Sequence, residues 1–364
     1  MRILNIIDHL SLGGAQAVVK GTIENCQRNN HFLFVLRKTD ITISIDQPNV
    51  FIFDSDIKYS LKPLKELKEI IDNEKIEVLH CHLFRAQFLG WLLKKRYFPE
   101  IKIIFHEHGR IFSDIYLYNL FIKHSVSQVD LFLAVSEATK KHLIRNANIP
   151  DNKIKVLYNF VDTRKYNRSN ILWNIEEERI RLGINRHDFV VGFAARMTER
   201  KGWHIFVEAA DSVLKKCPNI KFLIAGDGKD KERLIRLINR KNLFNKIIFI
   251  GYISNMVWFY SLLNCFIIPS QWEPMGLTDI EAQAMGIPVI SSDVEALNEI
   301  IKDEENGLLF EANNHNDLAK KIIRLRQYSE TRQKLINGGY ETVKKFNLDA
   351  YLLDLNMQYE GLIN

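Results

Sequence analysis

Residues 272–290 read WEPMGLTDIEAQAMGIPVI, and this stretch decides the fold of the second half of the chain. The apolar run 265–269 precedes it and the apolar run 288–290 closes it. Short apolar runs bounded by turn residues predict buried strands, and the residues between them predict a loop followed by a short helix. Strands that alternate with helices favour an α/β fold with parallel sheets.

The helix within this stretch carries start and stop signals. Thr278 followed three positions later by Glu281 predicts a capping box, and Gly286 predicts the C-terminal stop. The first turn would leave the backbone N–H groups of Gly276, Leu277 and Thr278 unpaired, because the first N–H groups of a helix have no intrahelical partner. Unpaired donors and the helix dipole both favour an anion, so the sequence predicts a phosphate site here.

Two carboxylates frame that turn. Glu273 lies in the loop and Glu281 lies one helical turn in. A carboxylate facing a phosphate would be repelled, so we expect both to accept hydrogen bonds from neutral hydroxyls. A sugar nucleotide offers both kinds of group, hydroxyls on the sugar and ribose and charge on the diphosphate. The alternative is that Glu281 caps its own helix and Glu273 is a solvated loop residue.

The order of these residues resembles the E-x7-E signature of retaining glycosyltransferases, in particular family 4 of the GT-B fold. The resemblance implies that Glu273 contacts the donor sugar and Glu281 the ribose. It also implies that the backbone amides of Met275, Gly276 and Leu277 contact the diphosphate. The expected enzyme uses a nucleotide diphosphate sugar as substrate and requires neither a metal nor another cofactor.

Length and composition describe a globular protein with two domains. The chain has 364 residues, which suits two domains of about 150 to 200 residues each. Hydrophobic residues make up 46% and charged residues 26%, and no run approaches the roughly 20 apolar residues of a membrane span. The first residues resemble a strand rather than a secretory signal, so we expect a cytoplasmic protein.

The cysteines and the net charge indicate the redox state of the protein and the partners it could bind. The four cysteines stand singly at wide spacings with no C-x-x-C, which predicts reduced thiols. The formal charge of +6 permits association with anionic surfaces. Nucleic-acid binding is not expected, because no dense basic stripe carries regularly spaced aromatic residues.

Strand-like runs alternate with helix-like ones along the whole chain. In the first half they cover residues 2–8, 32–36, 50–53, 77–81, 101–105, 131–135 and 155–157. In the second half they cover residues 189–194, 221–225, 247–250, 265–268, 289–291 and 308–310. We predict two Rossmann-like, doubly wound parallel sheets that face a central cleft in the GT-B arrangement. The predicted parts are an acceptor-side domain (1–165), a linker (166–188), a nucleotide-sugar domain (189–345) and a final helix that crosses back to the first domain (346–364).

Loops at the carboxyl ends of parallel strands are where such sheets bind ligands. Gly13 and Gly14 follow the first strand, and paired glycines let a phosphate or sugar approach the backbone, although an ordinary turn is the alternative. They resemble the G-G-A segment that covers the donor diphosphate in family 4. His108, directly before Gly109, resembles the family's histidine that approaches the donor sugar. The sequence leaves open whether His106 or His108 is the one that faces the sugar.

Two histidine pairs, at 80/82 and at 106/108, end consecutive strands and suggest a zinc hypothesis. Residues two apart on a strand share a face, so the intervening Cys81 and Glu107 point the other way. A four-ligand site is therefore disfavoured, and we expect no metal. Ordinary packing remains open for His80 and His82.

Residues 83–98, LFRAQFLGWLLKKRYF from Leu83 to Phe98, predict a helix that mixes aromatic and basic side chains. Such a helix could dock peripherally on the inner face of an anionic membrane. More often a helix of this kind buries one face and solvates the other. Both interpretations stay open.

The loop after the first strand of the second half reads Arg196-Met-Thr-Glu-Arg-Lys201-Gly. Its cations could neutralise a departing diphosphate, whereas solvated loop cations are the alternative. The spacing resembles the R-x4-K-G element of family 4, which implies that Arg196 and Lys201 bind the diphosphate. Ile253 resembles the place where family members hold the base through the backbone. Residues 226–228 form a bare G-x-G, which is too little for a dinucleotide fingerprint.

We therefore predict a retaining hexosyltransferase of polysaccharide or glycolipid biosynthesis. It would move a sugar from a UDP- or GDP-sugar to a glycan or lipid-linked acceptor, with His108, Glu273, Arg196 and Lys201 as the catalytic residues. Two alternatives stay open: a sugar-nucleotide epimerase of related fold, and a noncatalytic sugar-nucleotide-binding protein. The donor sugar, base, acceptor, linkage and oligomeric state are left undefined by the sequence.

Overall fold

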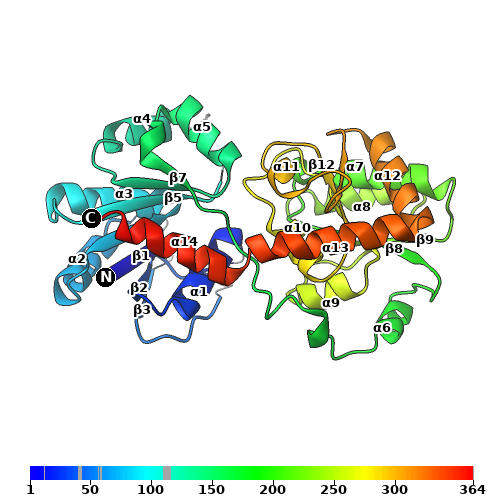
Figure 1. The fold of residues 1–364 in the computed structure, drawn as a ribbon, viewed down its shortest axis with the longest axis horizontal. Helices are drawn as coiled ribbons and strands as arrows, with labels where there is room; N and C mark the ends of the chain where they lie inside the picture. Colours follow the sequence, from blue (N-terminus) through cyan, green and yellow to red (C-terminus); the bar gives the residue numbers. More distant parts are fainter. Residues whose placement is uncertain (12, 40–42, 56, 58–59, 110–115, 364) are drawn as a thin grey trace. The chain divides into compact units, whose positions relative to one another are not determined.

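The computed structural model describes residues 1–11, 13–39, 43–55, 57, 60–109 and 116–363 (Figure 1). The chain divides into two compact units. The first comprises Met1–Phe160 and Leu348–Asn364, and the second comprises Val161–Asn347. Each unit has its own parallel sheet, covered by helices on both faces.

The first unit is built on a seven-stranded sheet of order β3-β2-β1-β4-β5-β6-β7. Its strands are β1 (Arg2–Ile7), β2 (Asn30–Val35), β3 (Val50–Ile52), β4 (Val78–His82), β5 (Lys102–Glu107), β6 (Leu131–Ala134) and β7 (Ile154–Val156). Four helices cover one face: α2 (Pro63–Asn73), α3 (Leu83–Arg96), α4 (Tyr116–Ser125) and α5 (Glu137–Ala147). The other face is covered by α1 (Gly14–Asn25) and α14 (Leu348–Glu360).

The alternation of side chains along β1 serves two cores at once. Leu4 and Ile6 pack beneath the four helices, whereas Ile3 packs on the opposite face with α1 and α14. A strand that is buried on both faces needs apolar residues at nearly every position, which is why β1 reads RILNII. Asn5 is the polar exception on the α14 face, and it is only 1% exposed.

Helix α14 follows the whole second unit in sequence yet packs on the first, as the red helix among the blue and green elements in Figure 1. It buries Leu348, Tyr351, Leu355 and Tyr359 in the core that contains Ile3. The two chain segments that connect the units are paired, because Val161 N–H donates to the carbonyl oxygen of Phe346 at 2.8 Å.

The second unit is built on a six-stranded sheet of order β10-β9-β8-β11-β12-β13. Its strands are β8 (Phe189–Ala194), β9 (Ile220–Ala225), β10 (Ile247–Phe249), β11 (Cys265–Ile268), β12 (Val289–Ser292) and β13 (Leu308–Phe310). One face packs against α7 (Trp203–Leu214), α8 (Lys231–Arg240) and α12 (His315–Gln327). The remaining helices are α6 (Ile175–Arg181), α9 (Met256–Ser261), α10 (Leu277–Ala284), α11 (Leu297–Ile300) and α13 (Ser329–Lys345).

The predicted α/β fold with two parallel sheets is confirmed. Every predicted strand is present, with ends that differ from the prediction by at most two residues. The helix predicted over residues 83–98 is α3, and the predicted break near residue 346 separates α13 from α14. Residues 166–188, predicted to be a linker, are grouped with the second unit. No helix in the described ranges is long and apolar enough to cross a membrane.

Candidate active site

In each sheet the strand order reverses at one point, and α/β proteins bind ligands beyond the carboxyl ends of the strands there. In the second unit the reversal lies between β8 and β11, and the loops after these strands carry Arg196, Lys201 and Glu273. In the first unit it lies between β1 and β4, and the loop after β1 carries Gly13. The predicted residues therefore gather at the switch point of each sheet.

Lys201 and Glu273 form the centre of the site in the second unit. The Lys201 Nζ lies 2.5 Å from Oε1 of Glu273, and the Ser270 hydroxyl donates to the same oxygen at 2.7 Å. Glu273 is only 7% exposed. Both interactions use Oε1, so the carboxylate is held in place, while Oε2 has no hydrogen bond to any described residue and can accept one from a ligand hydroxyl.

The loops after β8 and β11 are locked together by Gly202. This residue has φ of +71°, and a Cβ placed on it would lie 1.8 Å from the carbonyl oxygen of Pro269. Only glycine allows the start of α7 to lie this close to the end of β11. In the same two loops, the Arg200 guanidinium lies over the Trp272 ring at 4.8 Å, so Arg200 is engaged in packing.

Arg196 lies directly beyond β8 and is exposed. Within the described residues it forms no ion pair or side-chain hydrogen bond. A guanidinium with no side-chain partner in the described ranges can bind an anion at the carboxyl edge of the sheet, and its planar donors suit a phosphate.

Helix α10 begins at Leu277, and its N-cap is Gly276, whose side chain offers no cap. The predicted capping box of Thr278 and Glu281 is therefore wrong, because Thr278 already lies inside the helix. The predicted stop at Gly286 is confirmed, since this glycine has φ of +65° just past the C-cap. The start at Leu277 leaves the first N–H groups of α10 without intrahelical partners, as the phosphate hypothesis requires.

Glu281 binds two tyrosines instead of capping its helix. The Tyr260 hydroxyl donates to Oε2 of Glu281 at 2.9 Å, and the Tyr166 hydroxyl also forms a hydrogen bond with this carboxylate. Burial raises the pKa of Glu281, and the two hydrogen bonds oppose that shift. Sequence reasoning missed both tyrosines, because nothing in the spacing of a distant tyrosine predicts that it will meet a particular carboxylate.

Asp279 is the acid in the first turn of α10, and it is fully buried. Burial raises the pKa of Asp279 well above its usual value, which favours the protonated form. Its Oδ2 atom has no hydrogen-bond partner within the described residues. A neutral Asp279 adds no negative charge to the helix N-terminus, and Lys201 neutralises Glu273. Arg196 therefore adds positive charge at this edge of the sheet, which suits a diphosphate.

The remaining predicted residues of the second unit occupy loops. Met275 is buried, with 2% exposure, immediately before Gly276. Ile253 is partly buried between β10 and α9. Gly226, of the bare G-x-G, has a structural role, because a Cβ there would lie 1.9 Å from the carbonyl oxygen of Ala195.

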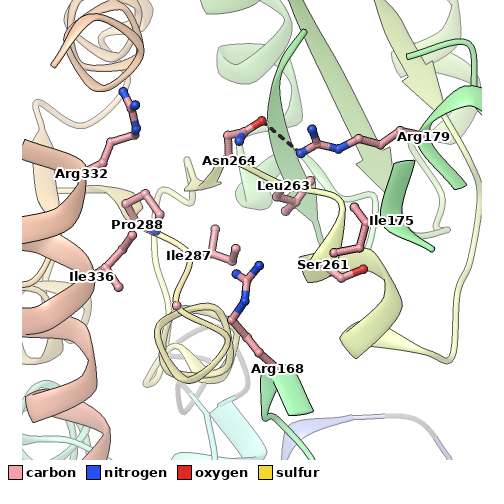
Figure 2. A pocket seen from close by; sticks show the side chains of 11 residues that line it. Arg168, Ile175, Arg179, Ser261, Leu263, Asn264, Ile287, Pro288, Arg332 and Ile336 are labelled. Atoms are coloured by element: carbon pink, nitrogen blue, oxygen red, sulfur yellow. Dashed lines mark hydrogen bonds between the residues drawn. The ribbon is translucent and has the colours of Figure 1, made fainter. Parts of the chain in front are cut away.

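A cavity of about 260 Å³ lies at the opposite edge of the same sheet (Figure 2). Its walls include Asn264 and Pro288, which precede β11 and β12, so it opens at the amino ends of these strands. Three arginines face it, but Arg179 donates to Leu262 O at 2.7 Å and to Asn264 Oδ1 at 3.1 Å. The arginines bind neighbouring backbone carbonyls and Asn264, and the cavity is separate from the candidate active site.

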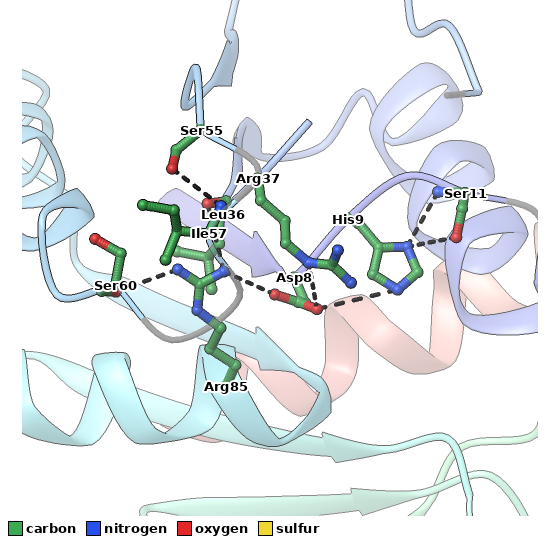
Figure 3. A network of polar contacts seen from close by, with 9 residues as sticks. All are labelled: Asp8, His9, Ser11, Leu36, Arg37, Ser55, Ile57, Ser60 and Arg85. Atoms are coloured by element: carbon green, nitrogen blue, oxygen red, sulfur yellow. Dashed lines mark hydrogen bonds and ion pairs between the residues drawn. The ribbon is translucent and has the colours of Figure 1, made fainter. Parts of the chain in front are cut away.

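In the first unit, the loop after β1 is held by a charge network around Asp8 (Figure 3). Its carboxylate pairs with Arg37 at 3.1 Å and with Arg85 at 2.9 Å. The network joins the loops after β1 and β2 to α3 and leads into Gly13 and Gly14. Gly13 is exposed and extended, with φ of 175°, and α1 begins at Gly14. The two glycines therefore precede a helix, as predicted, although the backbone angle of Gly13 alone does not require glycine.

The histidines lie on the α14 face, near the carboxyl ends of β4 and β5. Nδ1 of His82 lies 2.9 Å from Nε2 of His108, and Nε2 of His80 lies 3.2 Å from Nδ1 of His106. His106 is completely buried within β5, whereas His108 lies beyond the strand and is partly exposed. This difference favours His108 over His106 as the residue that can reach a ligand.

The predicted facing of the strand residues is confirmed, since Cys81 belongs to the core on the opposite face. Ring nitrogens of His80, His82 and His106 lie within 4.8 Å of one another and could hold a metal ion. These three possible metal ligands include no carboxylate. The carboxylate of Glu107 is engaged elsewhere, since its Oε1 accepts a hydrogen bond from Gln87 at 2.7 Å.

Helix α3, proposed above as a membrane contact, uses much of its surface within the first unit. Leu89 and Leu93 are buried, Arg85 pairs with Asp8, and Lys94 pairs with Asp130 at 2.6 Å. Phe84, at 41% exposure, is its most exposed phenylalanine. The helix thus mainly buries one face in the first unit, and a small set of apolar and basic side chains stays exposed, namely Phe84, Lys95 and Arg96.

Comparison with known proteins places this geometry in a class. Residues 12–165 match the model of "Glycosyltransferase Family 4", and residues 174–342 match "Glycosyl transferases group 1". Together with the two parallel-sheet units, these matches define a glycosyltransferase of the GT-B fold. The chain belongs to this family, with a family 4 N-terminal half and a group 1 C-terminal half.

Three similar proteins span most of the chain. An uncharacterized glycosyltransferase of Methanocaldococcus jannaschii is 27% identical and covers 93% of this chain and 92% of its own. A UDP-Gal:alpha-D-GlcNAc-diphosphoundecaprenol alpha-1,3-galactosyltransferase of Escherichia coli is 25% identical and covers 78% and 77%. The Anabaena HepE structure in complex with UDP-glucose is 19% identical, with a TM-score of 0.84 over 99% of this chain and 100% of its own.

Proposed function

We propose that this protein transfers a hexose from a nucleoside diphosphate sugar to a glycan or lipid-linked acceptor, with retention at the anomeric carbon. The observation that carries the proposal is the pair of Lys201 with the buried Glu273, beside the open N-terminus of α10. This arrangement places cationic and neutral hydrogen-bonding groups side by side, as a sugar diphosphate requires.

Each predicted residue has a role in this proposal. Arg196, Lys201 and the backbone N–H groups of Met275, Gly276 and Leu277 stabilise the diphosphate as it leaves, so the residues themselves supply the positive charge that a metal could supply. Glu273 orients the donor sugar through its free carboxylate oxygen. Glu281, held by its two tyrosines, accepts a hydrogen bond from the ribose.

The other contacts complete the donor site. Backbone groups near Ile253 hold the base, His108 contacts the donor sugar, and the Gly13–Gly14 turn contacts the diphosphate. Retention follows if the acceptor hydroxyl attacks from the face that the diphosphate leaves, with a diphosphate oxygen receiving its proton. Glu273 is not assigned as a covalent nucleophile, because Lys201 and Ser270 already engage its carboxylate.

The comparisons support a nucleotide-sugar donor and a surface-glycan product. HepE was solved with UDP-glucose, and the Escherichia coli relative acts on a sugar linked to diphosphoundecaprenol. A lipid-linked acceptor lies at a membrane surface. We therefore propose peripheral contact through the exposed remainder of α3, centred on Phe84, Lys95 and Arg96, at the cytoplasmic face.

The test is binding and turnover of UDP- and GDP-sugars in the presence of EDTA. We expect one nucleotide class to raise the melting temperature, since a ligand at 100 times its Kd adds about 2.7 kcal/mol to the free energy of unfolding. Lys201→Ala and Glu281→Gln should lose that stabilisation. Lys215→Ala, an exposed lysine just past α7, should keep it.

Product analysis separates the alternatives. Transfer to an acceptor, with the α-linked product expected from an α-linked donor, supports the proposal. Conversion of the donor sugar without any acceptor would indicate an epimerase. Binding without turnover in the presence of lipid-linked and free glycan acceptors would indicate a binding protein, and an inverted product would refute retention.

A further inference from the structure

One face of the first sheet changes character along the strands. Near the amino ends it is apolar, with Ile3, Val78 and Ile104 packed beneath α14. Two residues further along the same strands the face becomes polar, with Asn5 on β1, His80 on β4 and His106 on β5. Their side chains are at most 1% exposed, so each polar atom needs a partner inside the protein.

The orientation of the Asn5 amide is fixed by its surroundings. Its Nδ2 lies 3.1 Å from the carbonyl oxygen of Phe32 and 3.1 Å from Nδ1 of His31. A carbonyl oxygen can only accept, so the Asn5 atom beside it must be the amide nitrogen. The other amide atom, Oδ1, is then an acceptor, and it lies 3.4 Å from Nε2 of His82.

The same reasoning passes from His82 to His108. Since Asn5 Oδ1 only accepts, His82 must carry its proton on Nε2, which leaves His82 Nδ1 as an acceptor. Nδ1 of His82 lies 2.9 Å from Nε2 of His108, so His108 must donate through Nε2–H. Both rings are neutral in this chain of bonds. Consistently, burial lowers the pKa of His82 well below its usual range and that of His108 to about 3.

We propose that Asn5 and His82 are positioning residues that hold His108 in the Nε2–H tautomer, so that Nδ1 of His108 presents a lone pair to the bound sugar. This rests on the proposed function, in which His108 approaches the donor. His108 Nδ1 is buried and has no hydrogen-bond partner within the described residues. A buried acceptor without a partner costs free energy, and a ligand hydroxyl that reaches it recovers this cost.

The tautomer of His108 determines which kind of sugar substituent can form a hydrogen bond with it. A lone pair on Nδ1 requires a hydrogen-bond donor, so the sugar must offer a hydroxyl at that position. A carbonyl, a carboxylate or fluorine at that position would only accept and would face the lone pair unfavourably. The opposite tautomer would tolerate these groups.

A metal held by His80, His82 and His106 is the competing explanation for this cluster. It would require a lone pair from each of the three rings, whereas the Nδ1 lone pair of His82 already accepts from His108 and Nδ1 of His80 contacts the Tyr359 hydroxyl at 2.7 Å. A buried divalent ion with three neutral ligands would also lack a compensating carboxylate. The hydrogen-bonded arrangement is therefore favoured.

The first experiment reads the tautomer in the free, full-length protein. Protein labelled with ¹⁵N-histidine is examined by long-range ¹H–¹⁵N correlation at pH 7.5, with His108→Asn used to assign the His108 signals. We expect a protonated Nε2 and an unprotonated Nδ1. A protonated Nδ1 on His108 would overturn the proposal without touching the proposed function, because no sugar is present. The same sample treated with Co²⁺ should show no tetrahedral cobalt absorption, and its appearance would establish the metal site instead.

The second experiment asks whether His82 acts through His108. His82→Leu should release the preference of His108 for Nε2–H and lower kcat by about tenfold, the value of one hydrogen bond of about 1.4 kcal/mol. His80→Leu is the matched control, since His80 lies on the same face of β4 and its ring packs 4.2 Å from that of His82, but its hydrogen bonds go to Tyr359 and His106. It should leave the His108 signals unchanged. Loss of kcat in both variants with an unchanged tautomer would show a purely structural role.

Donor analogues test the lone pair itself, with UDP-glucose and its deoxy and deoxyfluoro derivatives as probes. At the sugar position that faces His108, both derivatives should lose about tenfold in binding relative to UDP-glucose, because fluorine cannot donate. His108→Ala should abolish that difference. Recovery of binding by the fluoro derivative would show that His108 donates, which contradicts the proposed tautomer. Failure of every UDP- and GDP-sugar to bind, with the expected tautomer present, would count against the proposed function alone.

Discussion

At the scale of one residue, Asp279 should make the stability of the protein depend on pH, because its carboxyl is fully buried in the first turn of α10. Its pKa is raised above its usual value of 3.8, so the folded protein binds more protons than the unfolded chain. The contribution of Asp279 to the free energy of unfolding must therefore fall as pH rises above about 3.8, by at most about 1.4 kcal/mol per pH unit until the folded-state pKa is reached.

We expect Asp279→Asn to remove this dependence. The variant should gain stability over the parent protein as pH is raised from 5 to 8, measured by urea unfolding at each pH. Glu232→Gln is the control, since Glu232 is an exposed acid in the first turn of α8 and should leave the pH dependence unchanged. A parent protein whose stability rises over this range relative to Asp279→Asn would contradict the assignment.

Gly202 gives a second prediction for a single residue. Gly202→Ala should destabilise the protein by about 3 kcal/mol or more, because a positive φ and a clash with Pro269 act together. Gly183→Ala measures the cost of the positive φ alone, since Gly183 has φ of +72° but nothing within 4 Å of a Cβ. This substitution should destabilise the protein by about 1 kcal/mol. Thermal and urea unfolding measure both. Equal losses in the two variants would show that the contact with Pro269 relaxes.

The residue scale also shows how far sequence could reach. The loop positions of Arg196, Lys201 and Glu273 follow from the strand pattern, because parallel strands bring their carboxyl ends to one edge. The Lys201–Glu273 contact itself was not predictable, since it depends on how Gly202 seats one loop against the other. The functional roles of these residues stay predictions.

At the scale of elements, the start of α10 was mispredicted for a physical reason. Thr278 and Glu281 have the spacing of a capping box, but a tertiary partner competes for the carboxylate. The hydroxyls of Tyr260 and Tyr166 occupy Glu281, so the helix begins two residues earlier than a Thr278 cap requires, with Gly276 as its N-cap. Local patterns of this kind cannot include a partner that comes from another element.

Helix α14 supplies the prediction at this scale. Leu355→Ala should cost about 2 to 5 kcal/mol in free energy of unfolding, because the side chain is fully buried against the first sheet. Leu353→Ala, on the same helix but 56% exposed, should change stability by less than about 0.5 kcal/mol. Urea unfolding measures both variants. Similar small effects would mean that α14 contributes little to the first core.

At the scale of the whole molecule, the two units should respond to pH with opposite signs. The first unit buries His31, His80, His82 and His106, whose pKa values are lowered, that of His31 to about 4. Unfolding exposes them to protonation, so stability is fully present above pH 6.5 and is lost as pH falls below it. The second unit buries Asp279 with a raised pKa and gains stability over the same fall.

Hydrogen exchange, corrected for intrinsic rates, tests this contrast between pH 7.5 and 5.5. Amides of β4 and β5 should lose protection at pH 5.5, while those of β11 and α10 should gain it. His204, whose pKa is lowered, opposes the gain in the second unit, but it is only partly buried. Parallel changes in both units would contradict the prediction.

The strands of both sheets could be predicted from the sequence, but the unit to which residues 161–188 belong could not. Apolar periodicity identifies each strand, because strands buried on both faces leave a local pattern. Residues 161–188 have no such pattern, and the hydrogen bond from Trp173 Nε1 to Ser261 and those from Arg179 to Leu262 attach them to the second unit. Such contacts join residues far apart in the chain, so no local window contains them.

The return of α14 to the first unit has a consequence for biosynthesis. Residues 161–347, which number 347 − 160 = 187, must leave the ribosome before α14 can close the first core. At about 5 to 20 residues per second this interval lasts roughly 10 to 40 s. During it the apolar and imidazole-lined face of the first sheet lacks the helix that covers it, so the nascent chain offers a binding surface to chaperones. The half that is translated first is therefore completed last.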